Sequence, residues 1–229
     1  MQARSGLGGV RLLSSLPSDD LAEIERRCRW RRYLSKEQIF DRESDGADVY
    51  FVVDGCIQIV NFSPSGREIA FADVKHGDFF GELTALDGKS RSASAVAVID
   101  TTLASLTAPT FKELLLKHPD IAFVVLLHLA GIVRSADSRI MDLSTLSAIN
   151  RVQAEILRMA EPRADDSNVG IVRRLPSHND IASRVGTTRE TVSRVLSQLS
   201  RIRVAKRDGH GLVVFDRRRL GAMIDPEAI

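Results

Sequence analysis

Residues 77–94 read GDFFGELTALDGKSRSAS, a short polar interruption between two apolar runs. The glycines and a short helical turn free backbone N–H groups that can point at phosphate oxygens, and Arg91 adds a planar, two-pronged donor. A carboxylate such as Glu82 repels a phosphate but accepts hydrogen bonds from a sugar hydroxyl. The combination favours a nucleotide. An isolated Gly-Glu and Arg-Ser pairing is more often a surface loop with a salt bridge, so the rest of the chain has to decide.

The composition is that of an ordinary globular protein of 229 residues, with 44% hydrophobic and 27% charged residues, which is long enough for two domains. No run approaches about 18 apolar residues, so length argues against a transmembrane span, and the N-terminus lacks a signal-peptide core. Cys28 and Cys56 lie far apart without a CxxC partner. This argues against zinc or iron–sulfur ligation and fits a reducing cytoplasm. We therefore expect a cytoplasmic protein with no membrane contact and no bound metal.

Charge is unevenly divided along the chain. From residue 150 onward there are 15 Lys and Arg against 10 Asp and Glu, a net charge of +5, whereas the whole chain carries +2. A basic C-terminal part beside a mildly acidic N-terminal part indicates that only the former meets a polyanion. Charge alone is a weak signal, because many basic surfaces bind nothing.

Short β-strands are expected to dominate residues 1–118. Residues 49–53 and 56–60 are apolar runs separated by Asp54-Gly55, the dipeptide of a type I′ turn, so we expect them to form a hairpin. Further strands are expected at 69–74, 93–98 and 103–106. Many short strands at this spacing predict a β-roll or barrel.

A long helix is expected over residues 119–147. Apolar or small residues there step by three and four, as in an a/d heptad seam: Leu126, Leu129, Val133, Ala136, Ile140 and Leu143. The helix would be about 40 Å long at about 1.5 Å per residue. The seam is buried either against the chain's own domain or against a second copy. We favour the second copy, because a strict a/d stripe suits a parallel pair of helices, and we predict a homodimer through the 120–146 helix.

Residues 148–229 predict a winged helix-turn-helix domain. Ser177 can cap a first helix, Gly186 permits a tight turn, and Thr187 or Thr188 can cap a second helix. A closing hairpin around Asp208-Gly209 reads as a wing.

The second helix of this motif carries polar and charged residues on one side, namely Thr188, Arg189, Glu190, Ser193 and Arg194. Arg can bond guanine bidentately and Glu can accept from cytosine N4, which is the chemistry that a DNA major groove requires. The alternative is a solvated helix with a weak Arg–Glu pair. The preceding helix, the glycine turn and the wing favour the DNA interpretation. Lys206, Arg207 and Arg217–Arg219 would contact phosphates or serve solubility, and the sequence does not separate these roles.

Together these features resemble the cyclic-AMP receptor protein and fumarate–nitrate regulator superfamily of bacterial transcription factors. The resemblance covers about residues 10–220 and rests on the Gly81-Glu82-Leu83 and Arg91-Ser92-Ala93-Ser94 cassette, followed by a long helix and then by Arg189-Glu190-Thr191-Val192-Ser193-Arg194. It implies an α+β fold with an N-terminal jelly-roll domain that binds a cyclic nucleotide. It also implies a homodimer that binds palindromic DNA, with RNA polymerase as a further partner.

The resemblance also assigns roles to residues. Glu82 would hold the ribose 2′-hydroxyl, while Arg91, Ser92 and nearby backbone amides, among Gly81, Leu83 and Ala93, would hold the cyclic phosphate. In the C-terminal domain, the base-reading positions imply a TGTGA-like half-site. The effector would be cyclic AMP, with no other cofactor.

This sequence departs from the relatives that sense other ligands. Cys28 and Cys56 cannot supply the cysteine ligands of an iron–sulfur cluster. An isolated His76 could bind haem, but an intact nucleotide cassette has no purpose in that scheme, so we interpret His76 as a turn residue.

The sequence also departs from the cyclic-AMP receptor protein on the long helix. Where that protein places Thr and Ser hydroxyls over the adenine, this chain has Ala136 and Asp137. Ala136 cannot hydrogen-bond, whereas Asp137 could accept from adenine N6 or from guanine N1–H and N2–H. We therefore hypothesise relaxed selectivity that admits cyclic GMP. The alternative is that Asp137 faces solvent or pairs with Arg134 or Arg139.

Three other functions are alternatives. A ligand-independent regulator of the same superfamily would keep the fold and the DNA binding. A nucleotide-binding subunit that controls a partner protein would require the C-terminal helix pair to be coincidental. A phosphodiesterase would need clustered metal ligands, but the five histidines are scattered singly, so we expect no enzyme activity and assign no catalytic residue.

Overall fold

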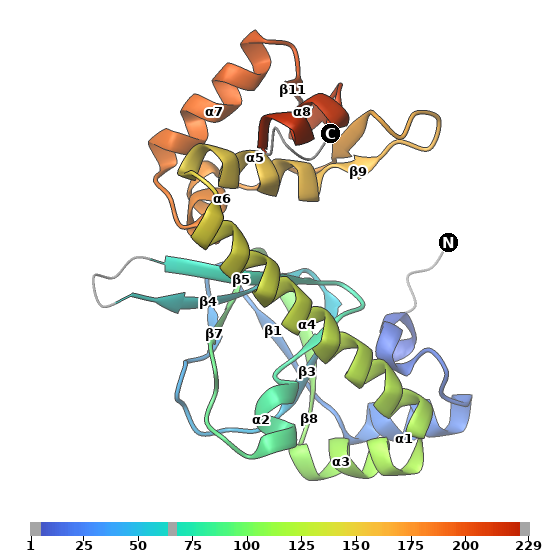
Figure 1. The fold of residues 1–229 in the computed structure, drawn as a ribbon. Coiled ribbons are helices and arrows are strands. Elements are labelled where there is room, and N and C mark those ends of the chain that lie inside the picture. The colour runs from blue at the N-terminus through green and yellow to red at the C-terminus, as the bar shows by residue number, and fades with distance from the viewer. Residues whose placement is uncertain (1–5, 64–67, 225–229) are drawn as a thin grey trace. The chain divides into compact units, whose positions relative to one another are not determined.

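The structure, a computed structural model, describes residues 6–63 and 68–224 (Figure 1). The chain divides into two compact units, Met1–Ile132 and Val133–Ile229, with the boundary inside helix α4 (Pro119–Thr145). Each unit has its own apolar core and is described by itself.

Unit 1 is built on two antiparallel sheets, as Figure 1 shows. One has the strand order β1 (Arg29–Tyr33), β8 (Thr101–Leu106), β3 (Val49–Asp54), β6 (Phe79–Phe80). The other has the order β2 (Gln38–Phe40), β7 (Ser94–Ala97), β4 (Cys56–Phe62), β5 (Glu68–Lys75). The helical elements are η1 (Leu7–Gly9), η2 (Arg11–Leu13), α1 (Ser18–Arg27), α2 (Glu82–Asp87) and α3 (Ala108–Lys117). The arrangement confirms the predicted N-terminal β-roll.

The hairpin predicted at Asp54-Gly55 is wrong. Strands β3 and β4 lie in different sheets, because β3 pairs with β8 and β6, whereas β4 pairs with β5 and β7. Gly55, with φ of 98°, packs so closely on Thr101 that an added Cβ would lie 2.7 Å from the Thr101 Cα. The dipeptide therefore makes the bend at which the chain crosses from one sheet to the other. The turn predicted after β4 falls partly on residues 64–67, outside the described residues, although β4 and β5 do pair antiparallel.

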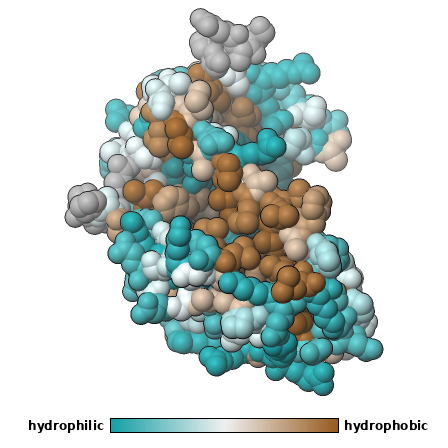
Figure 2. Space-filling view, turned by 60° about the horizontal axis from the view of Figure 1, so that its bottom comes forward, coloured by the Kyte–Doolittle hydropathy of each residue, from teal (hydrophilic) through white to brown (hydrophobic). Residues whose placement is uncertain are grey.

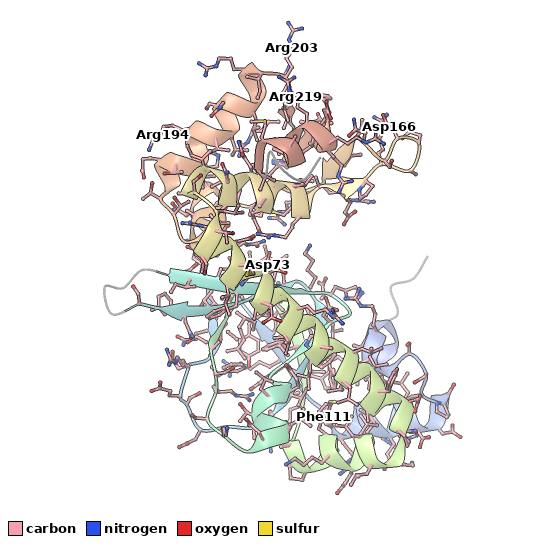
Figure 3. All side chains as sticks on the ribbon, in the orientation of Figure 1. Asp73, Phe111, Asp166, Arg194, Arg203 and Arg219 are labelled. Atoms are coloured by element: carbon pink, nitrogen blue, oxygen red, sulfur yellow. The ribbon has the colours of Figure 1, made fainter. Side chains whose placement is uncertain are left out.

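The core of unit 1 holds the first turns of α4. Phe111 on α3 points inward (Figure 3) and belongs to the same buried cluster as Ile121 and Val125 of α4. N-terminal residues contribute as well, since Leu7 and Leu12 are buried in this cluster. The start of α4 is therefore fixed to the β-roll by burial of apolar surface.

The rest of α4 is mostly exposed. Apolar side chains stand free along it, including Phe123, Leu126, Leu127, Val133, Ile140, Met141 and Leu143. The space-filling view shows a broad area of apolar side chains on the face turned to the viewer (Figure 2). By length and composition alone, α4 is apolar enough to cross a membrane. The expectation that length excludes such a span was therefore wrong, because it counted only unbroken apolar runs.

Unit 2 contains α5 (Ala148–Met159), α6 (His178–Val185), α7 (Arg189–Arg201) and α8 (Arg217–Ile224). Its sheet has the order β11 (Ala205–Asp208), β12 (Gly211–Val214), β10 (Gly170–Val172), β9 (Glu161–Pro162). The paired strands β11 and β12 confirm the predicted wing, with Gly209 at φ of 53° in its turn.

Ion pairs within unit 2 join the end of α4 to α5 and α6. Arg158 Nη1 lies 2.6 Å from Asp142 Oδ2, and its Nη2 lies 3.2 Å from Glu155 Oε2. Arg184 Nη1 approaches the other Glu155 oxygen at 3.6 Å. Because Glu155 is buried, this network offsets the cost of removing its charge from water.

Candidate functional site

Arg91 is buried in unit 1, with 3% of its surface exposed. Its Nη1 donates to the Gly81 carbonyl oxygen at 3.0 Å, and its Nη2 donates to the Asp48 carbonyl oxygen at 2.7 Å. The buried Nε, however, has no hydrogen-bond partner. Burial lowers the pKa of Arg91, opposed by Tyr50 and then by the charges of Asp48 and Glu82. A buried donor without an acceptor is costly, so this guanidinium is suited to bind an anion.

Aromatic rings position the same guanidinium. The Arg91 Cζ lies 4.2 Å from the centre of the Phe40 ring and 5.7 Å from that of Tyr50. Phe40 and Tyr50 pack on each other and on Phe80, so two rings contact the cation and a third supports them. Cation–π attraction and the two hydrogen bonds together keep Arg91 in one place.

Gly81 gives the backbone the close approach that this arrangement needs. It is the N-cap of α2 and adopts φ of 85°, which favours glycine. A Cβ at this position would lie 2.7 Å from Arg91 Nη1 and 2.9 Å from the Asp48 carbonyl oxygen. A side chain at position 81 would therefore displace the guanidinium.

Glu82 begins α2 and is 4% exposed. Its Oε1 lies 3.7 Å from the Nε2 of His128 on α4, and the His128 ring packs 4.5 Å from the ring of Phe79. The structure therefore brings a carboxylate, a guanidinium and an imidazole to one end of the β-roll.

The other predicted nucleotide residues are placed differently. Leu83 and Ser92 are exposed, Ala93 is buried, and the Ser92 carbonyl oxygen accepts from Asn61 Nδ2 at 3.3 Å. Ala136 and Asp137 are exposed on the part of α4 that belongs to unit 2, so the structure does not join them to Glu82 and Arg91. His76 lies in a turn, as predicted.

The helix-turn-helix of unit 2 has the predicted caps. Ser177 and Asp180 form a reciprocal capping box at the start of α6, and Gly186 ends this helix with φ of 64°. Of the two candidate caps for α7, Thr188 is the N-cap, and its side chain accepts from the Thr191 amide at 3.3 Å. Thr187 is buried instead.

The polar side of α7 faces outward. Its apolar side is buried with α6 in the core of unit 2, through Val192, Val195 and Leu199. As a result, Arg189, Glu190 and Arg194 are exposed, and Arg194 projects from α7 in Figure 3. Ser193 is half-buried.

Glu190 is held ionised at the start of α7. Its own backbone N–H and then the Thr188 hydroxyl lower the pKa of its carboxyl, and the charges of Arg189 and Arg194 act in the same direction. One carboxylate thus stands among cations on an exposed helix face. This exposed arc of Arg189, Glu190 and Arg194 can offer both hydrogen-bond donors and an acceptor to the edges of bases.

Two domain families match these two sites. Residues 30–118 match the model of the cyclic nucleotide-binding domain, and residues 150–223 match that of the Crp-like helix-turn-helix domain. The chain is 34% identical over 170 residues to the cyclic AMP receptor protein of Thermus thermophilus, covering 74% of this chain and 76% of that protein. The chain belongs to the cyclic-AMP receptor protein and fumarate–nitrate regulator superfamily.

Solved structures of this superfamily share its architecture. The structure of FixK2 from Bradyrhizobium japonicum superposes with a TM-score of 0.71 at 28% identity, covering 85% of this chain and 96% of that one. A CooA variant from Carboxydothermus hydrogenoformans superposes with a TM-score of 0.81 over 98% of both chains, and at 18% identity it supports the fold alone. The chain is thus a transcription regulator of the superfamily, with a cyclic-nucleotide-binding domain and a helix-turn-helix DNA-binding domain, and it is not an enzyme.

Sequence reasoning missed several residues that shape the nucleotide domain of this superfamily member. Asp48 accepts from Arg91 through its main-chain carbonyl, and a carbonyl leaves no mark in the sequence. Tyr50 falls in an expected strand, where an aromatic residue is ordinary, and Phe40 falls in none. His128 interrupts the apolar run of residues 124–127. A polar ring inside such a run is the one signal that could have found it.

Proposed function

We propose that the chain is a cyclic-nucleotide-responsive transcription regulator that binds palindromic DNA as a homodimer. The observation that carries the proposal is the buried Arg91, whose Nε lacks an acceptor beside a buried Glu82. An unpaired buried donor costs about 1–3 kcal/mol, which a phosphate oxygen would recover. Glu82 repels phosphate but accepts from a hydroxyl, so the pair suits a phosphate joined to a sugar.

In this proposal, Arg91 and Ser92 hold the cyclic phosphate together with backbone groups of Gly81, Leu83 and Ala93, and Glu82 holds the ribose 2′-hydroxyl. The close approach of Gly81 to Arg91 supports a clamp of this kind. Cyclic AMP is the first candidate effector, because the relative from Thermus thermophilus is a cyclic AMP receptor protein.

Cyclic GMP is the second candidate effector. Ala136 offers no hydrogen bond to a base, whereas Asp137 can accept from either purine. Both residues are exposed on α4. Calorimetric titration with both nucleotides tests this step, and tight binding of cyclic AMP with none of cyclic GMP would contradict it.

Dimerisation is proposed to occur through α4. The a/d seam is exposed for most of its length, and Leu126, Val133, Ile140 and Leu143 would leave water only against another surface. Functionally the chain would divide into a nucleotide domain of residues 1–118, a dimer helix of residues 119–147 and a DNA-binding domain of residues 148–229. Two α4 helices would then carry the signal between the two kinds of domain.

The exposed arc on α7 is proposed to read DNA bases. Arg189, Glu190 and Arg194 would contact a TGTGA-like half-site, with Thr188 and Ser193 beside them. A symmetric dimer requires a palindrome whose half-sites are about one DNA turn apart, ~34 Å. The nucleotide would act by binding one arrangement of the two helices more tightly than another. Contact with RNA polymerase and a cytoplasmic location follow from this role.

The test is DNA binding to a TGTGA-type palindrome at fixed salt, titrated separately with cyclic AMP and cyclic GMP. We expect either nucleotide to tighten binding. Binding that is equally tight without nucleotide would instead favour a ligand-independent regulator. Arg189→Ala should cost roughly 1–3 kcal/mol and relax specificity at one base pair. Equal loss on all sequences would contradict the base-reading role.

A further inference from the structure

Helix α4 brings one polar side chain to the nucleotide clamp. His128 lies on the part of α4 that belongs to unit 1, and its Nε2 is 3.7 Å from Glu82 Oε1. Its ring packs against Phe79 with 4.5 Å between ring centres and an angle of 42° between the ring planes. The His128 side chain is 35% exposed, so the contact joins a partly exposed imidazole to a buried carboxylate.

Glu82 needs this neighbour. A carboxylate that is 4% exposed loses most of its hydration, and a buried charge without a partner is costly. In the part of the chain that the structure describes, His128 is the one basic side chain within 4.0 Å of a Glu82 oxygen. Arg91 acts on Glu82 only through its charge, because one N–H of each terminal nitrogen is directed to the carbonyl oxygen of Gly81 or Asp48.

We propose that His128 is a positioning residue that orients Glu82 toward the ribose 2′-hydroxyl and transmits ribose occupancy to α4. The inference rests on the proposed function, in which unit 1 binds a cyclic nucleotide. A ribose hydroxyl that donates to Glu82 shares the carboxylate with the imidazole that orients it, so the interaction of His128 with Glu82 differs between the free and the bound protein. A ligand shifts a conformation only through such a difference in interaction.

Because His128 lies on α4, its contact with Glu82 links the nucleotide clamp to that helix. The helix is continuous from Pro119 to Thr145 and includes the exposed seam residues Val133 and Ile140. A change at His128 is therefore felt by the element proposed to dimerise. This route lies within one subunit, and it operates through the sugar whichever base is bound.

The experiment compares cyclic AMP with 2′-deoxy cyclic AMP, which lacks the hydroxyl that Glu82 would hold. Calorimetric affinities are measured for the wild type, His128→Ala, His128→Gln and a matched control, His118→Ala. His118 makes an equivalent pair on Asp20 of α1, with 3.7 Å between Nε2 and Oδ2. The control thus removes a histidine–carboxylate contact of the same length that does not involve Glu82.

We expect His128→Ala to weaken the binding of cyclic AMP about tenfold, because one interaction with a charged group is lost. The same substitution should leave the affinity for 2′-deoxy cyclic AMP within about twofold of the wild type. His118→Ala should leave the affinity for both nucleotides within the same limit. His128→Gln keeps a nitrogen donor of similar reach and should stay within about threefold of the wild type for cyclic AMP. At saturating cyclic AMP, His128→Ala should also bind the palindrome less tightly than the wild type.

Equal weakening of both nucleotides by His128→Ala would overturn the proposal, because the residue would then act on the fold and not on Glu82. An equal effect of His118→Ala, or no rescue by Gln, would overturn it as well. Unchanged DNA binding at saturation would refute the link to α4. If the wild type bound neither nucleotide, the proposed function itself would fail, and this outcome is distinct from all the others.

Discussion

Gly81 and Gly88 flank α2 and allow the clamp to be tested with a matched pair of substitutions. Both residues have a left-handed backbone conformation, with φ of 85° and 73°. An alanine at either position should cost about 1–2 kcal/mol of stability for the backbone alone. Only at position 81 does the new Cβ collide, 2.7 Å from Arg91 Nη1, whereas at position 88 nothing lies within 4 Å.

Gly81→Ala therefore has a second cost. Arg91 must move away from the Gly81 and Asp48 carbonyl oxygens, and each such hydrogen bond to a charged group contributes about 1.5–3 kcal/mol. Loss of one of them brings the expected destabilisation to about 2.5–5 kcal/mol, against about 1–2 for Gly88→Ala. Displacing the guanidinium should also weaken the binding of cyclic AMP by about 10- to 100-fold, since each factor of ten corresponds to about 1.4 kcal/mol.

Stability is measured by urea unfolding followed by circular dichroism, and affinity by calorimetry on protein shown to be folded. Gly88→Ala should keep cyclic AMP affinity within about twofold of the wild type. If the two alanines weaken the nucleotide equally, the contact between Gly81 and Arg91 has no part in binding and the reasoning is refuted.

Three further predictions concern single side chains. Burial, and then neighbouring cations, lower the pKa of His178 below its ordinary 6.5. Near that pH the unfolded state therefore binds more protons than the folded state, so the free energy of unfolding should fall as pH drops through about 6.5. His178→Asn should remove that part of the pH dependence in urea unfolding. Arg158→Ala leaves the buried Glu155 with a poorer partner and should lower the free energy of unfolding by about 1–3 kcal/mol. Arg163→Ala, which removes the exposed ion pair with Asp165, should leave it nearly unchanged by the same measurement. Burial raises the pKa of Cys28 to about 12, so iodoacetamide at pH 8 should label it slowly until the chain unfolds, as mass spectrometry would show.

Local signals in the sequence predicted the C-terminal domain well. The caps at Ser177, Gly186 and Thr188 were readable because each depends on a few adjacent residues. The wing followed from its Asp-Gly turn for the same reason. The superfamily was likewise readable from two motifs in the right order, and the comparisons confirm it.

The same local rule failed at Asp54-Gly55. Turn chemistry reports which angles a dipeptide tolerates but not which strands pair beyond it. Here β3 pairs with Thr101–Leu106, far along the chain, and that pairing separates β3 from β4. The setting of Arg91 was hidden in a similar way, because one acceptor lies 43 residues away and is part of the main chain. The contact of His128 with Glu82 depends on tertiary packing for the same reason.

The two acceptors of Arg91 have a consequence for how this protein tolerates change. Both are main-chain carbonyls, so every amino acid at position 48 supplies the same oxygen, whereas position 81 admits only a residue without a Cβ. Substitution at position 48 therefore keeps the hydrogen bond and removes only the attraction of the Asp48 carboxylate, whereas substitution at position 81 displaces the guanidinium. A saturation library read out by nucleotide binding would show a permissive site and a forbidden site in contact with the same side chain.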